Sequence, residues 1–555
     1  MSTQRCLSHR CLMQTTARVH RGAALAVLCL AAFTINVDTT IVNIALPSLV
    51  LQLDASTREL QWVVDAYTLT FAALVLAAGS LSDRYGRKGA LLVGLAVFGS
   101  ATAVGGLVDS AGALIAVRAV MGVGAAVIFP ATLSIISNLY TERGERARAI
   151  GLWGAMTGLG VALGPVTGGW LLEHFWWGSV FVAMAPVAAV TFVAGALFVP
   201  TSRDPATPPV DVVGLVLSTL AIGTLVFSII EAPERGWSDP ATMAGFAIAA
   251  TAGAVFVAWE RRRPHPMLDV SLFRNLRFSA ASGSIMVIFF ALAGFIFLIT
   301  QYFQFLKGYS PLSTGVRILP VAICIAIGSL VGVRLAVGVG NKAVVATGLF
   351  LVGVSFAWVS TASTATPYIE IVGQMILAGL GMGLTTAPAT EAIMGVVPKE
   401  KAGIGSAVND ATRELGATLG VAIIGSVYAS LYASGIQDAA GSLPAPALDA
   451  ASDSIGAALA VSNQLGPAGQ PLLEASQAAF FDGFQLGCLV AASVLIAGAA
   501  FAARYLPSRP TVTITVEAKP EPVHAPTLET AGTAVAAGLP GCCWDREPSS
   551  PATVP

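Results

Sequence analysis

The chain has 555 residues, of which 55% are hydrophobic and only 11% are charged, and its formal net charge is −1. Because soluble globular domains carry about 25% charged residues, this composition excludes a soluble protein and indicates an all-α polytopic membrane protein. We expect the lipid bilayer as its surroundings and no nucleic-acid partner.

The N-terminal segment imitates a signal peptide, because several arginines precede a long apolar run. No A-x-A cleavage site follows, and the run continues through Asp38 and Asn43. We therefore predict a cytoplasmic segment over 1–21 and a first spanning helix directly after it.

Apolar windows of about 20 residues, the length that crosses a bilayer, predict fourteen spanning helices. The spacing fits two six-helix halves, 22–200 and 278–503, with a two-helix insert and linker, 201–277, between them. A degenerate repeat agrees with this 6+2+6 division, because Gly-Ser-Leu occurs at 79–81 and again at 328–330. The windows are 22–46, 60–80, 89–108, 112–138, 147–168, 178–199, 211–231, 240–259, 278–303, 314–336, 343–361, 369–390, 403–428 and 482–503.

Lysine and arginine gather at alternate ends of these windows. The other ends hold few basic residues, namely Arg58, Arg235 and Lys307, with Arg317 near that edge. Because cytoplasmic loops carry an excess of Lys and Arg, both termini are predicted to be cytoplasmic in a bacterial plasma membrane. Twelve spans would also place both termini inside, so the charge distribution alone does not exclude twelve.

Two segments lack a spanning pattern. Residues 431–478 are rich in Ala, Ser, Gly and Pro, and we expect them to form one long external loop. Residues 504–555, with their many prolines, are predicted to be a mostly disordered cytoplasmic tail.

A charged decapeptide, Gly-Ser-Leu-Ser-Asp-Arg-Tyr-Gly-Arg-Lys at 79–88, lies between two apolar runs. From the residues alone, it is either a topogenic loop whose charges face water or a loop whose acid is paired. The decapeptide resembles the G-x-L-x-D-R-x-G-R-K signature of the major facilitator superfamily. The resemblance implies a cytoplasmic gate loop made by Gly79, Asp83, Arg84, Gly86, Arg87 and Lys88.

Ionisable groups inside spanning helices are costly, so each is a functional candidate. Asp38 points away from Asn36, Thr40 and Asn43, which share another face of the same helix and are candidates to line a substrate cavity. Asp38 either exchanges protons or makes a structural hydrogen bond to another helix. The run 38–47, Asp-Thr-Thr-Ile-Val-Asn-Ile-Ala-Leu-Pro, resembles the first-helix signature of fourteen-span drug:proton antiporters.

Arg118 lies in the window 112–138 and needs a partner, because a guanidinium does not lose its proton in proteins. That partner is either a static counter-ion or an acid that alternates between paired and protonated states. The string around Arg118 is similar to the family's fourth-helix motif, whose arginine is implicated in proton coupling. Asp65, near the start of the window 60–80, is a second candidate to bind a proton or a cationic substrate.

Small residues recur at helical spacing near the end of the fifth window. Such spacing favours close helix packing, and a proline among them favours a bend. The pattern also resembles the antiporter motif G-x-x-x-G-P-x-x-G-G, which is found in exporters of this superfamily and indicates the direction of transport. The residues that match it are Gly160, Gly164, Pro165, Gly168 and Gly169.

Other polar and aromatic residues are weaker candidates. Trp62 and Tyr67 either belong to an interfacial aromatic belt or face the cavity, and Gln301 and Tyr302 close a predicted helix where substrate would exit. In the window 403–428 an arginine at i+3 lies between acids at i and i+4, and it can neutralise the acid at i locally. We interpret these three, Asp410, Arg413 and Glu414, as a structural cluster.

Motifs of soluble enzymes and cofactor sites are missing from the sequence. It has no G-x-x-x-x-G-K-[ST] motif, and neither its five histidines nor its seven cysteines have the spacing of metal ligands. We therefore expect neither an enzyme nor a bound cofactor or metal.

The resemblance extends over about residues 20–430 and implies a major facilitator fold with fourteen spans. It implies a monomeric antiporter, similar to actinomycete antibiotic exporters and quaternary-ammonium pumps, in which protons drive export of a small amphipathic drug by alternating access. Two alternatives remain open. One is a transporter of the same fold that exports another cargo, such as a siderophore, lipid or metabolite, or that runs as an importer; the other is a non-transporting membrane sensor.

Overall fold

The computed structural model describes residues 2–203, 211–264, 266–394, 402–439 and 445–507. Within these ranges every regular element is a helix. Among the described residues, fourteen helical segments are long and apolar enough to cross a membrane, the first Arg21–Leu53 and the last Ile455–Tyr505. The all-α fold with fourteen spans is therefore confirmed, whereas nearly all of the predicted tail lies outside the described residues.

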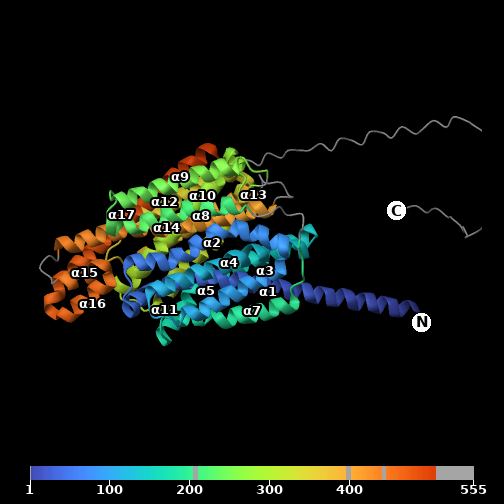
Figure 1. Ribbon diagram of the computed structural model, residues 1–555, viewed down its shortest axis with the longest axis horizontal. Coiled ribbons are helices and arrows are strands. Elements are labelled where there is room, and N and C mark those ends of the chain that lie inside the picture. The colour runs from blue at the N-terminus through green and yellow to red at the C-terminus, as the bar shows by residue number, and fades with distance from the viewer. Residues whose placement is uncertain (1, 204–210, 265, 395–401, 440–444, 508–555) are drawn as a thin grey trace, which may run out of the picture. The chain divides into compact units, whose positions relative to one another are not determined.

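The helices follow one another in three groups along the chain (Figure 1). The first group is α1 (Ser2–Leu53), α2 (Thr57–Tyr85), α3 (Arg87–Gly105), α4 (Ala111–Leu139), α5 (Arg143–His174), α6 (Ser179–Val182) and α7 (Met184–Phe198). The insert is α8 (Val212–Arg235) and α9 (Pro240–Glu260), followed by η1 (Val270–Arg274). The last group is α10 (Leu276–Gln301), η2 (Tyr302–Leu306), α11 (Pro311–Val339), α12 (Asn341–Val359), α13 (Tyr368–Met394), α14 (Ala402–Ala439), α15 (Ala445–Asp453), α16 (Ile455–Leu465), η4 (Gly466–Gly469) and α17 (Gln470–Tyr505).

The first and last groups pack by the same scheme. In the first group α1 lies against α5, and α4 lies against both α2 and α3. In the last group α10 lies against α14, and α13 lies against both α11 and α12. The repeated packing parallels the weak sequence repeat and shows two related helix bundles, which we call the first half (α1–α7) and the second half (α10–α17).

Two seams join the halves, one between α2 and α14 and the other between α5 and α11. Glycines allow close approach at the second seam. A Cβ on Gly169 of α5 would lie 2.5 Å from the Pro311 carbonyl oxygen, and a Cβ on Gly315 of α11 would collide with the Pro165 carbonyl. Only a residue without a side chain fits at either position.

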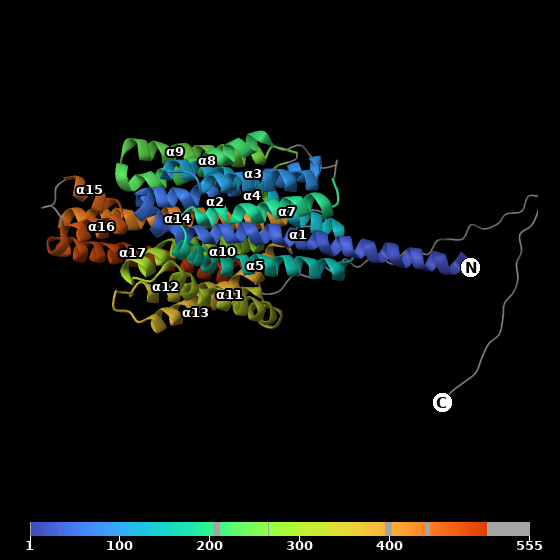
Figure 2. The ribbon, with the colours of Figure 1, turned by 90° about the horizontal axis from the view of Figure 1, so that it is seen from below.

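Helices occupy most of the segment that was expected as an external loop. α14 continues to Ala439, α15 and α16 form a hairpin, and α17 begins at Gln470, well before the window that starts at 482. The loop prediction was wrong for secondary structure because alanine, the best helix former, is abundant there although the segment is too polar to resemble a span. The hairpin projects from the bundle in both ribbon views (Figures 1 and 2).

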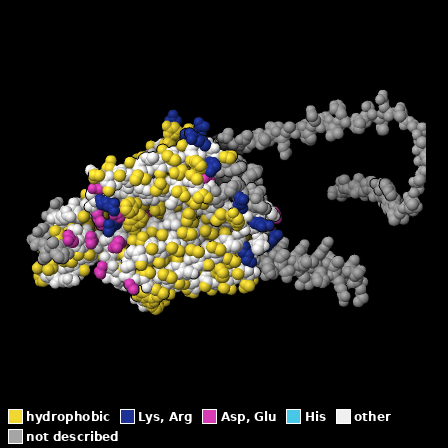
Figure 3. All heavy atoms as spheres, in the orientation of Figure 1, with side chains coloured by type: hydrophobic (Ala, Val, Ile, Leu, Met, Phe, Trp, Pro, Cys, Tyr) yellow, Lys and Arg dark blue, Asp and Glu magenta, His cyan; other side chains and the backbone are white. Residues whose placement is uncertain are grey.

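The two ends of the bundle differ. The hairpin α15–α16 defines what we call the hairpin end, and the first part of α1 projects beyond the opposite, terminal end (Figure 2). Hydrophobic side chains cover the middle of the visible face, acidic side chains gather toward the hairpin, and basic side chains gather near the terminal end (Figure 3). An apolar band between charged ends is the surface expected of a membrane-spanning bundle.

Candidate functional site

A cavity lies between the two halves and encloses about 1280 Å³, part of it open to solvent. Seven helices line it: α1, α2, α4 and α5 from the first half face α10, α11 and α14 from the second. Most of the lining is apolar, as is usual for sites that bind small organic molecules. Its aromatic side chains are Phe71, Phe129 and Phe289.

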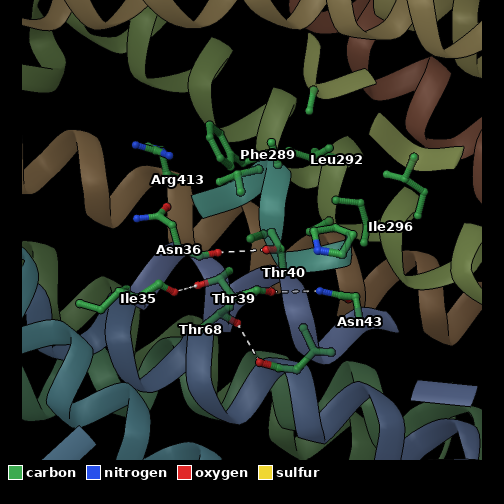
Figure 4. Close-up of a pocket in the computed structure, with 18 of the residues that line it drawn as sticks. Ile35, Asn36, Thr39, Thr40, Asn43, Thr68, Phe289, Leu292, Ile296 and Arg413 are labelled. Carbon is green, nitrogen blue, oxygen red and sulfur yellow. Dashed lines mark hydrogen bonds between the residues drawn. The ribbon is translucent and has the colours of Figure 1, made fainter. Parts of the chain in front are cut away.

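One face of α1 supplies the polar part of the lining, as shown in Figure 4. Asn36, Thr39, Thr40 and Asn43 all reach the cavity. Their donors bond back to α1 itself: Thr40 Oγ1 lies 3.0 Å from the Asn36 carbonyl oxygen, and Asn43 Nδ2 lies 3.0 Å from that of Thr39. The threonine hydroxyl protons and one N–H of each asparagine amide are thus used inside the helix, so this face presents acceptor oxygens and one remaining amide N–H per asparagine to a ligand.

Behind that face, α1 carries a fully buried ion pair. Arg118 Nη1 of α4 lies 2.8 Å from Asp38 Oδ2, and the two side chains are 1% and 0% exposed. Arg118 Nε also donates to the Val63 carbonyl oxygen at 3.0 Å, and its guanidinium carbon lies 4.2 Å from the centre of the Tyr67 ring. Asp38 Oδ1 has no hydrogen-bond partner in the described structure. The acid is therefore held by one contact and remains free to accept a proton at its second oxygen.

Asp65 is buried at the seam between α2 and α14. Neither carboxyl oxygen of Asp65 has a partner among the described residues. It shares a helix face with Gln61 and Thr68, both of which contact α14: Gln61 Nε2 lies 3.2 Å from the Val421 carbonyl oxygen, and Thr418 Oγ1 lies 2.9 Å from Thr68 Oγ1. An unpartnered acid in this position lies where the two halves meet.

The charged decapeptide ties helices of the first half together. Arg87 Nε and Ser134 Oγ lie 2.6 and 2.7 Å from Asp83 Oδ1, so α2, α3 and α4 share one carboxylate. Lys88 Nζ donates to the Ala196 carbonyl oxygen of α7 at 2.7 Å, while Arg84 lies over the ring of Tyr85.

The two glycines of the decapeptide serve its turn and its packing. Gly86 has φ of 130°, a backbone conformation that side chains with a Cβ rarely adopt. Gly79 faces Pro130 of α4, where a Cβ would lie 3.6 Å from the proline Cβ. The turn from α2 to α3 therefore depends on Gly86, whereas Gly79 has ordinary van der Waals space.

The glycine motif of α5 packs against the cavity-lining helix. A Cβ on Gly160 would lie 2.8 Å from the Phe33 carbonyl oxygen, and one on Gly164 would lie 3.0 Å from that of Val37. Gly168 meets Ile41 one turn further on. Together with Gly169 and Pro165 at the α5–α11 seam, these residues connect α1 to the second half of the molecule.

The other cavity candidates lie outside its lining. Trp62 packs against Phe227 of the insert, with ring centres 6.0 Å apart, and Tyr67 covers Arg118. Gln301 at the end of α10 and Tyr302 at the start of η2 are both fully buried.

The cavity also receives three charged side chains that the sequence did not place there. Asp410, Arg413 and Glu414 of α14 all belong to its lining, together with Ala417 and Val421 further along the helix. The spacing 410, 414, 417, 421 marks one helical stripe, which is the signal that could have identified this face. These three residues are therefore part of the candidate site, and the interpretation as a purely structural cluster was incomplete.

A family model described as Major Facilitator Superfamily matches residues 28–421. The chain belongs to the major facilitator superfamily. It is 37% identical to the multidrug efflux pump LfrA of Mycolicibacterium smegmatis, over 86% of this chain and 94% of that protein. It is 33% identical to the methyl viologen resistance protein SmvA of Salmonella typhimurium, over 85% of this chain and 95% of that protein. This facilitator is accordingly a multi-pass membrane transporter and not an enzyme.

Solved structures share the same fold. The inward-facing, occupied structure of a bacterial homologue of the human lysosomal transporter Spinster superposes with a TM-score of 0.62, at 17% identity, over 88% of this facilitator and 97% of that chain. At this level of identity, the likeness supports the facilitator fold alone.

Proposed function

We propose that this facilitator is a proton-coupled antiporter that exports amphipathic drugs across the bacterial plasma membrane by alternating access. The observation that carries the proposal is the arrangement of α1, which has Asn36 and Asn43 in the cavity and Asp38 paired with Arg118 directly behind them. Binding of a drug and binding of a proton then act on two faces of the same helix. The multidrug-efflux name of the relative LfrA supports the cargo.

The proton would act through the ion pair. Protonation of Asp38 removes its negative charge, so the charged Arg118 loses its counter-ion and α1 and α4 no longer attract each other. α1 also packs on the α5 glycines, and α5 forms a seam with the second half. A change at Asp38 is thus transmitted to the contact that must open and close, while Asp65 provides a second acid at the other seam.

The excess of basic side chains at the terminal end supports a cytoplasmic location for that end. The halves meet at the hairpin end, where Gln304 Nε2 donates to the Ile44 carbonyl oxygen at 3.0 Å and Gly169 faces Pro311. We assign this arrangement to a state closed toward the outside. The decapeptide would then latch the cytoplasmic side when the cavity opens outward.

Inverted membrane vesicles with a respiration-driven, inside-acid pH gradient test the proposal. Addition of a drug such as ethidium should collapse the dye-reported gradient in vesicles with the wild-type protein and fail to do so with Asp38→Asn. Asp54→Asn is the matched control, because Asp54 is exposed at the end of α1 with φ of 50°, a conformation that asparagine tolerates. Drug-induced gradient collapse that persists in Asp38→Asn would contradict the assigned role of Asp38, and no response to any drug in the wild type would contradict the cargo.

A further inference from the structure

Three side chains of α14 account for all the charge in the described lining of the cavity. They are Asp410, Arg413 and Glu414, and every other described residue of the lining is neutral. The pair Asp38–Arg118 lies behind α1, outside the lining, and its opposite charges compensate each other. The net charge that a ligand meets in the cavity is therefore set by one arginine and two acids on a single helix.

The lowest net charge of this lining follows from the chemistry of the three groups. A guanidinium does not lose its proton in proteins, whereas each carboxyl group is either neutral or singly negative. The net charge of the lining is therefore never more negative than −1, whatever the protonation of Asp410 and Glu414. Without Arg413, two ionised carboxylates would leave two negative charges.

Arg413 also occupies a surface that suits an organic cation. Its guanidinium carbon lies 4.5 Å from the centre of the Phe289 ring on α10. Aromatic faces attract cations, and this attraction is stronger where water is excluded. Figure 4 shows Arg413 beside Phe289, across from Asn36. The arginine thus acts as a tethered cation at the aromatic wall of the cavity.

The arginine is not locked into an ion pair with either acid. The ion pairs of the described residues, at N–O distances up to 4.0 Å, do not include Arg413. Its Nε is buried and has no hydrogen-bond partner in the described structure. Asp410 and Glu414 therefore keep oxygen atoms available for a ligand, while Arg413 limits how much positive charge that ligand can carry.

We infer that Arg413 is a specificity-determining residue that restricts the cavity to substrates with a single positive charge. This inference rests on the proposed export of amphipathic drugs. A monocation neutralises the lining when both acids are ionised. A dication leaves an unbalanced positive charge inside an apolar cavity, which is unfavourable.

Ethidium and propidium provide the test, because they share one ring system and propidium carries an additional quaternary ammonium group. Binding of each dye to the purified full-length protein in lipid nanodiscs would be followed by fluorescence titration. The wild type should bind ethidium about tenfold more tightly than propidium, and Arg413→Gln should reduce or reverse this ratio. Arg413→Lys is the matched control, because it keeps the positive charge and should keep the preference.

A variant in the opposite direction guards against a loss of folding in Arg413→Gln. Glu414→Gln removes a negative charge from the same stripe and should weaken ethidium binding severalfold. An unchanged ratio of the two affinities in Arg413→Gln, or a reversed ratio in Arg413→Lys, would overturn the role of the arginine charge. Neither result would contradict the proposal that the protein exports drugs. Wild-type protein that is folded but binds neither dye would instead contradict the proposed class of cargo.

Discussion

Asp38 and Arg118 are opposite charges that the fold keeps away from both water and the cavity. Each charge compensates for the lost hydration of the other, and removing one partner of such a pair costs about 3–5 kcal/mol. Only one oxygen of Asp38 is bonded, so the pair is stable enough to position α1 yet retains an open site for a proton. This combination suits a residue whose charge changes during a transport cycle.

The two charges should be energetically coupled. Asp38→Asn leaves the buried guanidinium without a counter-ion, and Arg118→Met leaves the carboxyl group without one, so each single variant should lower the melting temperature. The double variant should melt at a higher temperature than the two single effects predict when added. Thermal unfolding in detergent, monitored by tryptophan fluorescence, gives the melting temperatures of the wild type, the two single variants and the double variant. Strictly additive shifts would show that the pair contributes no coupling.

The hairpin α15–α16 is the element that closes one end of the bundle. Thr57 Oγ1 of α2 lies 2.7 Å from the Asp453 carbonyl oxygen, and a Cβ on Gly456 would lie 2.6 Å from Val50 and 2.7 Å from Phe305. The hairpin therefore contacts α1, α2 and the segment after α10. Opening of the cavity toward this end requires at least some of these contacts to break.

Docking of the hairpin should depend on pH. Partial burial raises the pKa of the Asp453 carboxyl, and the neighbouring Glu234, Asp449 and Glu59 raise it further, whereas Arg58 lowers it. The docked state therefore binds a proton more tightly than the undocked state. Its stabilisation is complete below the ordinary aspartate pKa of about 3.9 and is lost as the pH rises through the raised value.

Hydrogen exchange of the amides in 445–465, corrected for the intrinsic effect of pH, measures this dependence. Protection should be greater at pH 5 than at pH 8 in the wild type, and Asp453→Asn should show little difference between the two. Asp482→Asn serves as a control, because Asp482 lies in α17, outside the hairpin. Equal pH dependence in the wild type and Asp453→Asn would exclude Asp453 as the titrating group.

The sequence predicted the elements whose signals are local. Fourteen apolar runs of sufficient length and two ionisable residues within them, Asp38 and Arg118, were visible without any tertiary information. The sequence did not reveal that Asp410 and Arg413 face the cavity, because α14 contacts several helices and packing decides which of its faces lines the cavity. The helical hairpin was missed because an alanine-rich polar segment has the composition of a loop as well as that of a helix.

At the scale of the whole molecule, the insert bridges the two halves. Ser426 Oγ of α14 donates to the Ile229 carbonyl oxygen of α8 at 2.8 Å, and Trp237 Nε1 donates to Ser430 Oγ at 3.2 Å. Toward α2, the insert contributes Phe227, which packs against Trp62, and two acids that pair with Arg58, whose Nη1 lies 2.6 Å from Glu234 Oε2 and 3.3 Å from Glu231 Oε2. The contact between Ser426 and Ile229 is buried, whereas the Arg58 and Glu234 side chains are 37% and 51% exposed. If α2 and α14 separate at the hairpin end, the insert should therefore remain with the second half and release α2.

This argument predicts that Arg58 favours the closed hairpin end. Arg58→Glu places like charges together, and because exposed ion pairs contribute about 0–1 kcal/mol, the open population should rise by up to about fivefold. The measurement is labelling of Asn43→Cys, a cavity position, by a membrane-impermeant maleimide in right-side-out vesicles, in a background without the seven native cysteines. Adding Glu234→Arg restores opposite charges at the shorter of the two contacts and should lower labelling toward its original rate, while Glu231 still repels the new glutamate. Labelling that stays high in the charge-swapped protein would show that the ion pair is not the contact that holds α2 to the insert.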